Sequence, residues 1–470
     1  MDSSTIVATA TPVGNGGIGI IKISGTDAIK IVSSIFHRGP LPKGFPVLKK
    51  NNCFQLKSHT VYHGYIVDYE NRSVIDEILL LIMLAPNSYT RDDVVEIHAH
   101  CGQVVIQSVL ELVLKHGGIL AEPGEFTKRA FLSGRIDLSQ AEAVVDIINA
   151  KTKKALEAAT SHIKGDFSST IESIRDYFLQ LSAQIEAAID FSDQIDEEIC
   201  DLCQVDAFRS NATDKLTGLV NQYNDSRVVR DGFKVIITGQ PNVGKSSIMN
   251  RMIQQDRAIV TPFPGTTRDA IMETVIIDDV PVILTDSAGI HETDDPVEIL
   301  GIQKACDHIM EAQMVLFVVD ATKCCSAEDI SIYEKIENKP LVMVLNKSDL
   351  ADKPYKFIPP LSWNTTKRVA TSALYNTGFD NLRNLISGFF SHEKPDSPLN
   401  SLLPNLRQKL LLDRCVELAY FIEKGLLDKK PFELITIDIR EIINLLDQIT
   451  GNVVEEDVLD QIFSRFCIGK

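Results

Sequence analysis

The 470-residue sequence lacks the features of a membrane or exported protein. It has no run of eighteen consecutive apolar residues, which a membrane-spanning helix needs, and it begins Met1-Asp2-Ser3-Ser4 without a basic, Arg-rich or apolar leader. We therefore predict a cytosolic protein with no membrane partner. The length leaves room for about three domains. The share of hydrophobic residues, 44%, is that of ordinary globular domains.

An excess of positive charge is also missing. The sequence has 47 lysines and arginines against 64 aspartates and glutamates, which gives a formal net charge of −17. This balance argues against a polybasic surface that grips nucleic acid over the whole molecule, although a local basic patch could still hold RNA.

Cysteine and histidine do not form a metal or disulfide pattern. The nine cysteines are odd in number and scattered, unlike a disulfide framework. Cys200 and Cys203 have a zinc-like spacing, but no second pair stands near them, and a closed zinc site needs four ligands. His98 and His100 would share one face of a strand. Since the sequence places no third ligand there, we favour two hydrogen-bonded structural histidines over a metal site.

No proline occurs between Pro123 and Pro241, a stretch that is rich in helical periodicity. Apolar residues three and four apart would line one face of a long helix there, at Ile171, Ile174, Phe178, Leu181, Ile185 and Ile189. We therefore predict a helical bundle in this stretch. Residues 1–133 instead combine strand-like runs at 18–23 and 78–83 with a helical pattern at 103–115, which predicts a mixed α/β domain. Further helices are predicted at 406–427, 432–449 and 457–466.

A glycine-rich turn follows the apolar, β-branched run at 233–238. It reads Gly239-Gln240-Pro241-Asn242-Val243-Gly244-Lys245-Ser246. A strand that runs into such a turn is typical of a phosphate-binding loop, in which backbone N–H groups cradle the phosphates. Lys245 would neutralise the outer phosphates, and the Ser246 hydroxyl would ligate magnesium. A chance match in a loop is the alternative, and the motifs downstream oppose it.

Three companion motifs follow in order. The apolar run at 282–284 leads into Asp286-Ser287-Ala288-Gly289, which places a carboxylate where it can hold magnesium through water. The run at 341–345 leads into Asn346-Lys347-Ser348-Asp349. Asp349 can accept two hydrogen bonds from guanine but would stay unpaired against adenine, so the predicted nucleotide is GTP. A weaker base-side motif follows at Ser372-Ala373.

The order of these patterns predicts a multidomain fold of α/β plus α class. An N-terminal α/β domain would span residues 1–133. A discontinuous helical bundle would comprise residues 134–229 and 391–470. A Ras-like P-loop GTPase domain at 230–390 would be inserted into that bundle, since domain termini usually lie close together.

Further segments carry a resemblance to a known family. They are Thr5-Ile6-Val7-Ala8, Gly16-Gly17-Ile18-Gly19, Ala85-Pro86-Asn87-Ser88-Tyr89-Thr90, Pro123-Gly124-Glu125-Phe126-Thr127-Lys128-Arg129-Ala130-Phe131-Leu132, Asp137-Leu138-Ser139-Gln140-Ala141-Glu142-Ala143, Pro264-Gly265-Thr266-Thr267-Arg268-Asp269 and Phe466-Cys467-Ile468-Gly469-Lys470. With these segments, the chain resembles the MnmE (TrmE) family of tRNA-modification GTPases over essentially its full length.

The resemblance implies a potassium-dependent, magnesium-using GTPase that forms a homodimer. With the FAD-carrying flavoprotein MnmG (GidA), in a heterotetramer, it would add an aminomethyl-type (carboxymethylaminomethyl) group to the wobble uridine of tRNAs. The one-carbon donor would be a tetrahydrofolate derivative, in the 5-formyl or methylene form. The N-terminal domain would bind this folate and form the dimer.

The resemblance also implies roles around GTP. A Ras-like protein has a glutamine after Gly289 to orient the attacking water, whereas this chain has Ile290, and the family pattern assigns that work to Glu298. Potassium would replace an arginine finger and take oxygens of Asn242, Thr261, Phe263 and Thr266, with magnesium on Ser246 and Thr267. The remaining implied GTP-binding residues are Val243, Gly244, Lys245, Ser247, Pro262, Pro264, Gly265, Asp286, Ser287, Ala288, Gly289, Asn346, Lys347, Ser348 and Asp349. A turn-forming role for Asn242 and a solvated acid at Glu298 are the alternatives.

For the folate, the family pattern points to Lys22, Glu96, Arg135 and the C-terminal Lys470. Lysine stands at 22 where the family pattern suggests arginine, and arginine stands at 135 where it suggests lysine. The charges are kept, but the two side chains differ in geometry. Cys467 would face the folate pocket, and we hypothesise that it assists at the uridine ring; a buried small hydrophobe is the alternative.

Two further functions stay open from the sequence alone. The chain could be a GTP-switch assembly factor for RNA or ribosomal particles that uses hydrolysis as a timer. It could also store or sense one-carbon units. The Cys467 tail and the folate-type domain favour the modification enzyme, since a timer has no use for them.

Overall fold

The chain forms two compact units, which are described separately. The computed structural model describes residues 4–12, 14, 16–39, 57–190, 202–256, 272–286, 310–351, 355–363, 367–390, 402–428 and 430–470. The first unit comprises Met1–Val145, His162–Thr213 and Arg414–Lys470, and the second comprises Asp146–Ser161 and Asp214–Asp413. Within the described ranges, no helix has both the length and the apolar character needed to cross a membrane.

The first unit contains a seven-stranded sheet in the order β3-β4-β5-β6-β2-β1-β7. Its strands are β1 (Ile6–Thr9), β2 (Ile18–Ser24), β3 (Phe36–Arg38), β4 (Thr60–Asp68), β5 (Ser73–Met83), β6 (Val94–His100) and β7 (Ile119–Leu120). The helices α1 (Ala28–Ile35) and α2 (Gln103–Lys115) pack on one face, against Ile21 and Ile97. Because side chains alternate along a strand, the register partners Lys22 and Glu96 lie side by side on the other face.

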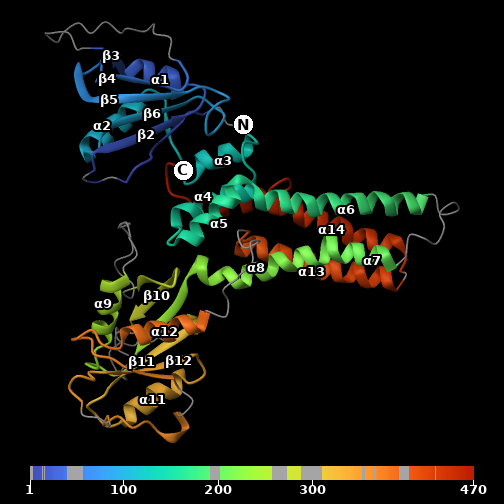
Figure 1. The fold of residues 1–470 in the computed structure, drawn as a ribbon. Helices are drawn as coiled ribbons and strands as arrows, with labels where there is room; N and C mark the ends of the chain where they lie inside the picture. Colours follow the sequence, from blue (N-terminus) through green and yellow to red (C-terminus); the bar gives the residue numbers. More distant parts are fainter. Residues whose placement is uncertain are drawn as a thin grey trace. The chain divides into compact units, whose positions relative to one another are not determined.

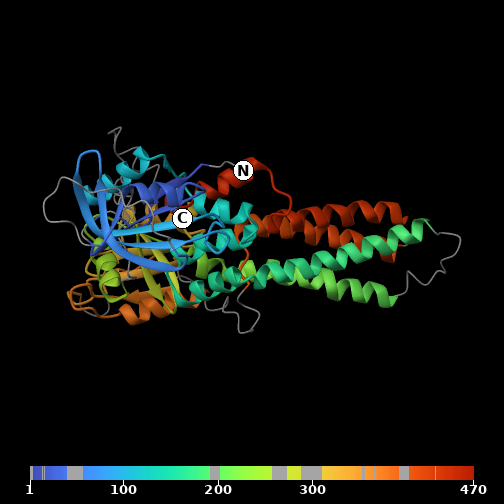
Figure 2. The same cartoon turned by 90° about the horizontal axis from the view of Figure 1, so that it is seen from above.

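The other described elements of the first unit are helices. Its helices are α3 (Glu125–Leu132), α4 (Leu138–Asn149), α6 (Asp166–Asp190), α7 (Leu202–Phe208), α14 (Phe432–Thr450) and α15 (Glu456–Phe463), with a π-helical turn at Arg209–Thr213. Three of the four boundaries between the units fall within α4, α5 (Lys153–Lys164) and α13 (Leu406–Leu427), and the fourth follows the π-helical turn at Thr213. The long helices α6 and α14 lie side by side in both views (Figures 1 and 2).

The end of the chain packs against α3 and α4 in a small hydrophobic core. Leu138, Phe463 and Phe466 are buried together. Gly124 has a φ of +71°, and a Cβ there would lie 2.8 Å from the carbonyl oxygen of Phe463. This close approach requires glycine at 124. It brings residues 467–470 to the α/β part of the unit.

The second unit contains a six-stranded sheet in the order β13-β12-β11-β8-β10-β9. Its strands are β8 (Phe233–Thr238), β9 (Met272–Ile277), β10 (Val280–Asp286), β11 (Met314–Asp320), β12 (Leu341–Asn346) and β13 (Lys367–Ala370). All neighbours are parallel except β9 and β10. Its helices are α8 (Asp214–Asp231), α9 (Lys245–Asp256), α11 (Ala327–Ile336) and α12 (Phe379–Phe390), with a 3-10 turn at Leu361–Trp363. Residues of α9 and α12 share the core on one face of the sheet and residues of α11 that on the other (Figure 1).

The predicted fold class is confirmed, and most predicted elements are present. The helices predicted at 103–115 and 406–427 coincide with α2 and α13. The helical stretch from 138 is divided, because Gly165 adopts a φ of +92° between α5 and α6. The helix predicted at 457–466 is α15, which ends at Phe463 where the chain turns. The predicted domain boundaries stay predictions.

Two ion pairs join α6 to α14 and differ in burial. Arg175 donates to the carboxylate of Asp447 at 2.7 Å and 3.2 Å, and the Asp447 side chain is only 11% exposed. Arg440 donates to Glu186 at 2.8 Å, but both of these side chains are about half exposed or more, at 69% and 49%.

We expect Asp447→Ala to lower the free energy of unfolding of the helical part by about 2–3 kcal/mol, because it leaves a half-buried guanidinium without its partner. Glu186→Ala, the matched control on the same two helices, should change it little, since exposed pairs contribute little. Urea titration followed by circular dichroism measures both. Equal losses in the two variants would contradict the difference.

Candidate functional site

The phosphate loop joins β8 to α9 in the second unit. Gly239 and Gly244 have φ angles of +148° and +98°. A Cβ on Gly244 would lie 2.3 Å from Nδ2 of Asn346, so only glycine fits there. Because α9 begins at Lys245, its unpaired backbone N–H groups face the loop, as an anion site requires.

Lys245 is held inside this loop. Its Nζ donates to the carbonyl oxygens of Gly239 and Gln240, each at 2.9 Å. Burial lowers the pKa of Lys245, and the charge of Asp286 partly offsets that effect. The ammonium group is therefore desolvated and close to where phosphates would lie.

Ser246 and Asp286 fit a magnesium ion. The Ser246 hydroxyl donates to Oδ2 of Asp286 at 3.0 Å. The other oxygen, Oδ1, is buried and has no hydrogen-bond partner among the described residues. Burying a carboxylate oxygen without a hydrogen-bond partner is unfavourable. A hard cation such as magnesium prefers oxygen ligands, so it could bind this oxygen and remove the penalty.

The base side of the domain is built on β11 and β12. Asn346 is buried, and its Nδ2 donates to the carbonyl oxygen of Val243 at 2.9 Å, which ties β12 to the phosphate loop. Its Oδ1 accepts a long hydrogen bond of 3.4 Å from the backbone of Ala373. Asp349 is exposed, so its carboxylate is open to a ligand.

Asp320 holds Lys347, a contact that the sequence reading missed. The Nζ of Lys347 lies 2.7 Å from Oδ2 of Asp320, and Thr322 donates to Oδ1 of Asp320. Burial opposes ionisation of Asp320, but its hydrogen bonds with Lys347 and Thr322 outweigh burial and lower its pKa. The sequence does contain a signal for this contact, because Asp320 directly follows the fully apolar run at 314–319, which is typical of a buried strand.

Ser247 is exposed on α9 and Ser348 is partly buried after β12, whereas eleven other predicted residues of the GTP site cannot be placed. Thr261, Pro262, Phe263, Pro264, Gly265, Thr266 and Thr267 lie outside the described residues, as do Ser287, Ala288, Gly289 and Glu298. Asn242 is described, is exposed and has a left-handed φ of +60°.

A second cluster lies in the first unit, where Lys22, Glu96, Arg135 and Lys470 come together. Nζ of Lys22 is 4.5 Å from the ring centre of Tyr89 and 4.8 Å from that of Phe126. Burial lowers the pKa of Lys22 to about 8, Glu96 raises it in part, and Lys470 and Arg135 lower it further. The four charged groups therefore act on one another, and three of them are cations.

Tyr89 organises this cluster, although the sequence reading noted it only within a longer segment. Arg135 lies over its ring at 4.7 Å and donates to its carbonyl oxygen at 3.2 Å. The Tyr89 hydroxyl and that of Thr127 on α3 are 3.1 Å apart. Two cations and one helix thus meet at a single aromatic side chain.

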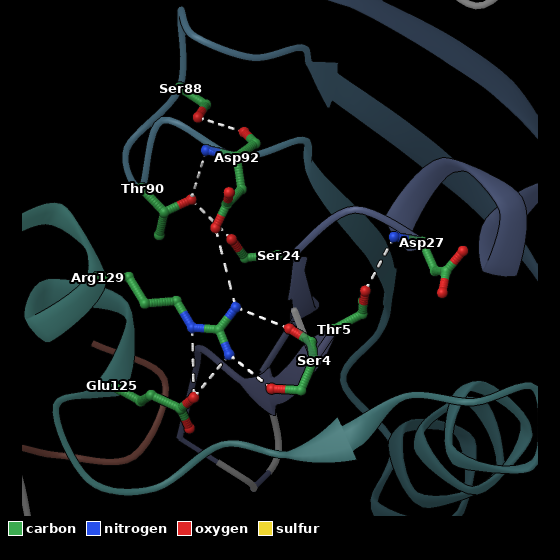
Figure 3. A network of polar contacts seen from close by, with 9 residues as sticks. All are labelled: Ser4, Thr5, Ser24, Asp27, Ser88, Thr90, Asp92, Glu125 and Arg129. Atoms are coloured by element: carbon green, nitrogen blue, oxygen red, sulfur yellow. Dashed lines mark hydrogen bonds and ion pairs between the residues drawn. The ribbon is translucent and has the colours of Figure 1, made fainter. Parts of the chain in front are cut away.

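A polar network fixes the loop that carries Tyr89 (Figure 3). Arg129 of α3 donates to the backbone and hydroxyl oxygens of Ser4 at 2.8 and 3.0 Å and to Glu125 at 2.8 Å, and it lies 3.8 Å from Asp92. The hydroxyls of Ser24 and Thr90 are 2.7 Å apart and buried. The loop is therefore held from β2 through Ser24 and from α3 through Arg129.

The C-terminal tail is anchored beside this cluster. Gly469 has a φ of +92°, and a Cβ there would lie 2.6 Å from the carbonyl oxygen of Thr9. The carbonyl oxygen of Lys470 accepts from the backbone of Phe126 at 3.2 Å. Cys467 is exposed with a free thiol, which differs from the buried hydrophobe considered as its alternative. The tail is thus fixed while the thiol stays accessible.

His98 and His100 each pair with a carboxylate. His98 is 3.2 Å from Glu96, and His100 is 2.7 Å from Asp76. The pairing with Glu96 places His98 at the edge of the Lys22 cluster.

Comparison with known proteins matches both units. Residues 5–135 match the family described as GTP-binding protein TrmE N-terminus, and residues 138–467 match the MnmE helical domain. The tRNA modification GTPase MnmE of Acetivibrio thermocellus is 41% identical over 467 residues, with 99% of each chain covered. That of Carboxydothermus hydrogenoformans is 38% identical over 471 residues, with 100% of each covered. A solved structure of Era with MgGDPNP and part of 16S ribosomal RNA shows 28% identity and a TM-score of 0.27, covering 39% of this chain and 65% of that one.

The electrostatic coupling around Lys22 can be measured by amine labelling as a function of pH, with peptide mass spectrometry. We expect the labelling of Lys22 to reach half its maximum near pH 8. The midpoint should fall in Glu96→Gln, which removes a stabilising negative charge, and rise in Arg135→Gln, which removes a repelling positive charge. Lys115 is the control, because its hydrogen bond with Glu70 raises its pKa. Midpoints that do not move in these two directions would contradict the cluster.

Proposed function

The chain belongs to the MnmE family of tRNA modification GTPases, and we propose that it is a potassium-dependent GTPase that modifies the wobble uridine of tRNA with a flavoprotein partner. The enzyme is a GTP hydrolase involved in tRNA modification. The group added would be of the aminomethyl type, carboxymethylaminomethyl, with a tetrahydrofolate derivative as the one-carbon donor.

The observation that carries this proposal is the Lys22 cluster with the anchored tail beside it. Lys22, Arg135 and Lys470 bring three cations to a site lined by the rings of Tyr89 and Phe126. Cations suit the carboxylates of a folate, and flat rings suit its pterin. A protein that only switches between GTP and GDP has no need of such a site.

In the GTPase domain, each described residue has a task in the proposed reaction. Lys245 exchanges the carbonyl oxygens of Gly239 and Gln240 for phosphate oxygens. Ser246 and Asp286 would hold magnesium, together with Thr267. Magnesium supplies positive charge to the phosphate oxygens. Asp349 would accept hydrogen bonds from the guanine edge.

Potassium and Glu298 complete the proposed hydrolytic site. Asn242, whose amide is exposed at the phosphate loop, would offer an oxygen to potassium, with Thr261, Phe263 and Thr266. The ion supplies positive charge where negative charge develops between the β- and γ-phosphates. Glu298 would orient the attacking water, since Ile290 cannot.

In the first unit, we propose that Lys22, Glu96, Arg135 and Lys470 bind the folate derivative, in its 5-formyl or methylene form. Cys467 would act at the uridine ring, from a thiol that is exposed next to that cluster. The remaining partners proposed are a second copy of the chain and MnmG (GidA), which carries FAD. Since the net charge of this chain is −17, we propose that MnmG supplies much of the binding to tRNA. The reaction would take place in the cytosol.

The potassium requirement is tested by GTP turnover in potassium chloride against sodium chloride at equal ionic strength. We expect potassium to accelerate turnover by about tenfold or more, the scale of a barrier lowered by about 1.4 kcal/mol. Asn242→Ala should remove that gain, because it removes a ligand oxygen, while Asn250→Ala, an exposed position on α9, should keep it. Turnover that is indifferent to the cation would reject the potassium assignment.

The role of the tail is tested with Cys467→Ser in the complex of the full chain with MnmG. The variant should lose tRNA modification while its GTP turnover stays normal, because Cys467 and the phosphate loop belong to different compact units. Cys324→Ser, also an exposed free cysteine, is the matched control. An undiminished modification rate in Cys467→Ser would contradict a role of this thiol at the uridine ring. Modification absent even from the unaltered chain with MnmG would instead favour the assembly factor.

A further inference from the structure

Arg251 links the helix of the phosphate loop to the base-side loop. It lies on α9, six residues after Lys245. Its guanidinium donates to the carbonyl oxygen of Ala373 through Nε at 3.1 Å and through a terminal nitrogen at 3.0 Å. The same terminal nitrogen reaches the carbonyl oxygen of Leu374 at 3.2 Å. One side chain therefore holds two successive peptide groups that lie 122 and 123 residues away in the sequence.

The base-side loop, residues 371–378, is closed at its base. The backbones of Ser372 and Thr377 exchange hydrogen bonds of 3.0 and 3.3 Å. Gly378 has a φ of +82°, and a Cβ there would lie 2.0 Å from the carbonyl oxygen of Ala370. These contacts fix where the loop leaves and rejoins the sheet.

The tip of this loop depends on other contacts. Leu374 and Tyr375 are 70% and 66% exposed, so core packing does not hold them. Among the described residues, the backbone N–H of Ala373 has one hydrogen-bond partner, Oδ1 of Asn346, at a long distance of 3.4 Å. That N–H is therefore a weakly bonded donor. It lies beside the end of β12, where Asn346 stands and from which the chain leads to Asp349. A hydrogen-bond acceptor of a ligand at this point could therefore accept from the N–H of Ala373.

Guanine has such an acceptor, the 6-oxo group, and adenine has none at that position. A donor discriminates between them only when it is held in place before the ligand binds. We propose that Arg251 is a positioning residue for guanine recognition: it fixes the carbonyl oxygens of Ala373 and Leu374 so that the N–H of Ala373 meets the 6-oxo group. The proposal rests on GTP as the nucleotide.

Arg251 also ties the two ends of the nucleotide site to one helix. The first turn of α9 carries Lys245 and Ser246 at the phosphates, and Arg251 lies about one and a half turns later at the base-side loop. Lysine cannot reproduce this contact in full, because its ammonium group lacks the second nitrogen, Nε, that also donates to the carbonyl oxygen of Ala373.

The test compares GDP with the 5′-diphosphate of 2-aminopurine riboside, which lacks the 6-oxo group. Dissociation constants of both are measured for the full chain and for Arg251→Ala, Arg251→Lys and Asn250→Ala. We expect Arg251→Ala to weaken GDP binding by about tenfold, equal to about 1.4 kcal/mol, and to leave binding of the analogue within about twofold, a difference of about 0.4 kcal/mol. Arg251→Lys should follow Arg251→Ala, and Asn250→Ala should behave as the unaltered chain.

Each other outcome overturns the proposal in a distinguishable way. Equal weakening of both nucleotides would make Arg251 a structural tie without a role in base recognition. Unchanged GDP affinity would remove any role. If the unaltered chain bound GDP and the analogue equally well, the guanine assignment itself would fail. Thermal unfolding without nucleotide identifies folded variants, and Arg251→Lys supplies the same ratio if Arg251→Ala does not fold.

Discussion

The side chain of Asn346, at the end of β12, donates to the carbonyl oxygen of Val243 in the phosphate loop at 2.9 Å. Strand β12, which ends in Asn346, is separated from β8 by β11, so this hydrogen bond joins a loop to a strand that is not its neighbour. The contact also explains Gly244, where a Cβ would lie 2.3 Å from Nδ2 of Asn346. An unpaired buried amide would cost about 1–3 kcal/mol. The phosphate loop and the base-side strand are therefore shaped together.

Both sites hold polar groups that the protein itself leaves incompletely satisfied. Oδ1 of Asp286 has no hydrogen-bond partner among the residues described, and the N–H of Ala373 has one long contact. Lys22 has a pKa lowered to about 8 by burial first and by Lys470 and Arg135 next. Groups with such unfavourable surroundings gather where ligands bind. Around Lys22, the ion pair of Arg129 with Asp92 helps to keep the Tyr89 loop in place.

The sequence predicted those parts of the sites that lie on one strand and the turn after it. The phosphate loop between β8 and α9 and the Asn346 to Asp349 motif after β12 are of this kind, because periodicity and glycine mark them locally. Contacts between distant segments could not be predicted this way. Arg251 meets a loop 122 residues away, Asp320 meets Lys347 from another strand, and Tyr89 receives Arg135 from beyond α3. No periodicity encodes such pairs, since they depend on how the elements pack. The anchored tail was expected only through the family resemblance, and the positive φ of Gly469 gives its physical reason.

The two partly buried lysines, Lys22 and Lys245, share one physical explanation. Lys245 lies against two carbonyl oxygens and Lys22 lies against two aromatic rings, and burial lowers the pKa of each. In each case the ammonium group loses much of its water when the protein folds. An anionic ligand that arrives later meets a charge that needs less further desolvation than an exposed lysine, and the attraction acts in a medium of lower dielectric constant than water. Partial contacts to dipoles and rings keep these charges in place without neutralising them. A carboxylate of the protein in full contact would have stabilised each lysine more, but it would have competed with the phosphate or folate that these sites are proposed to bind.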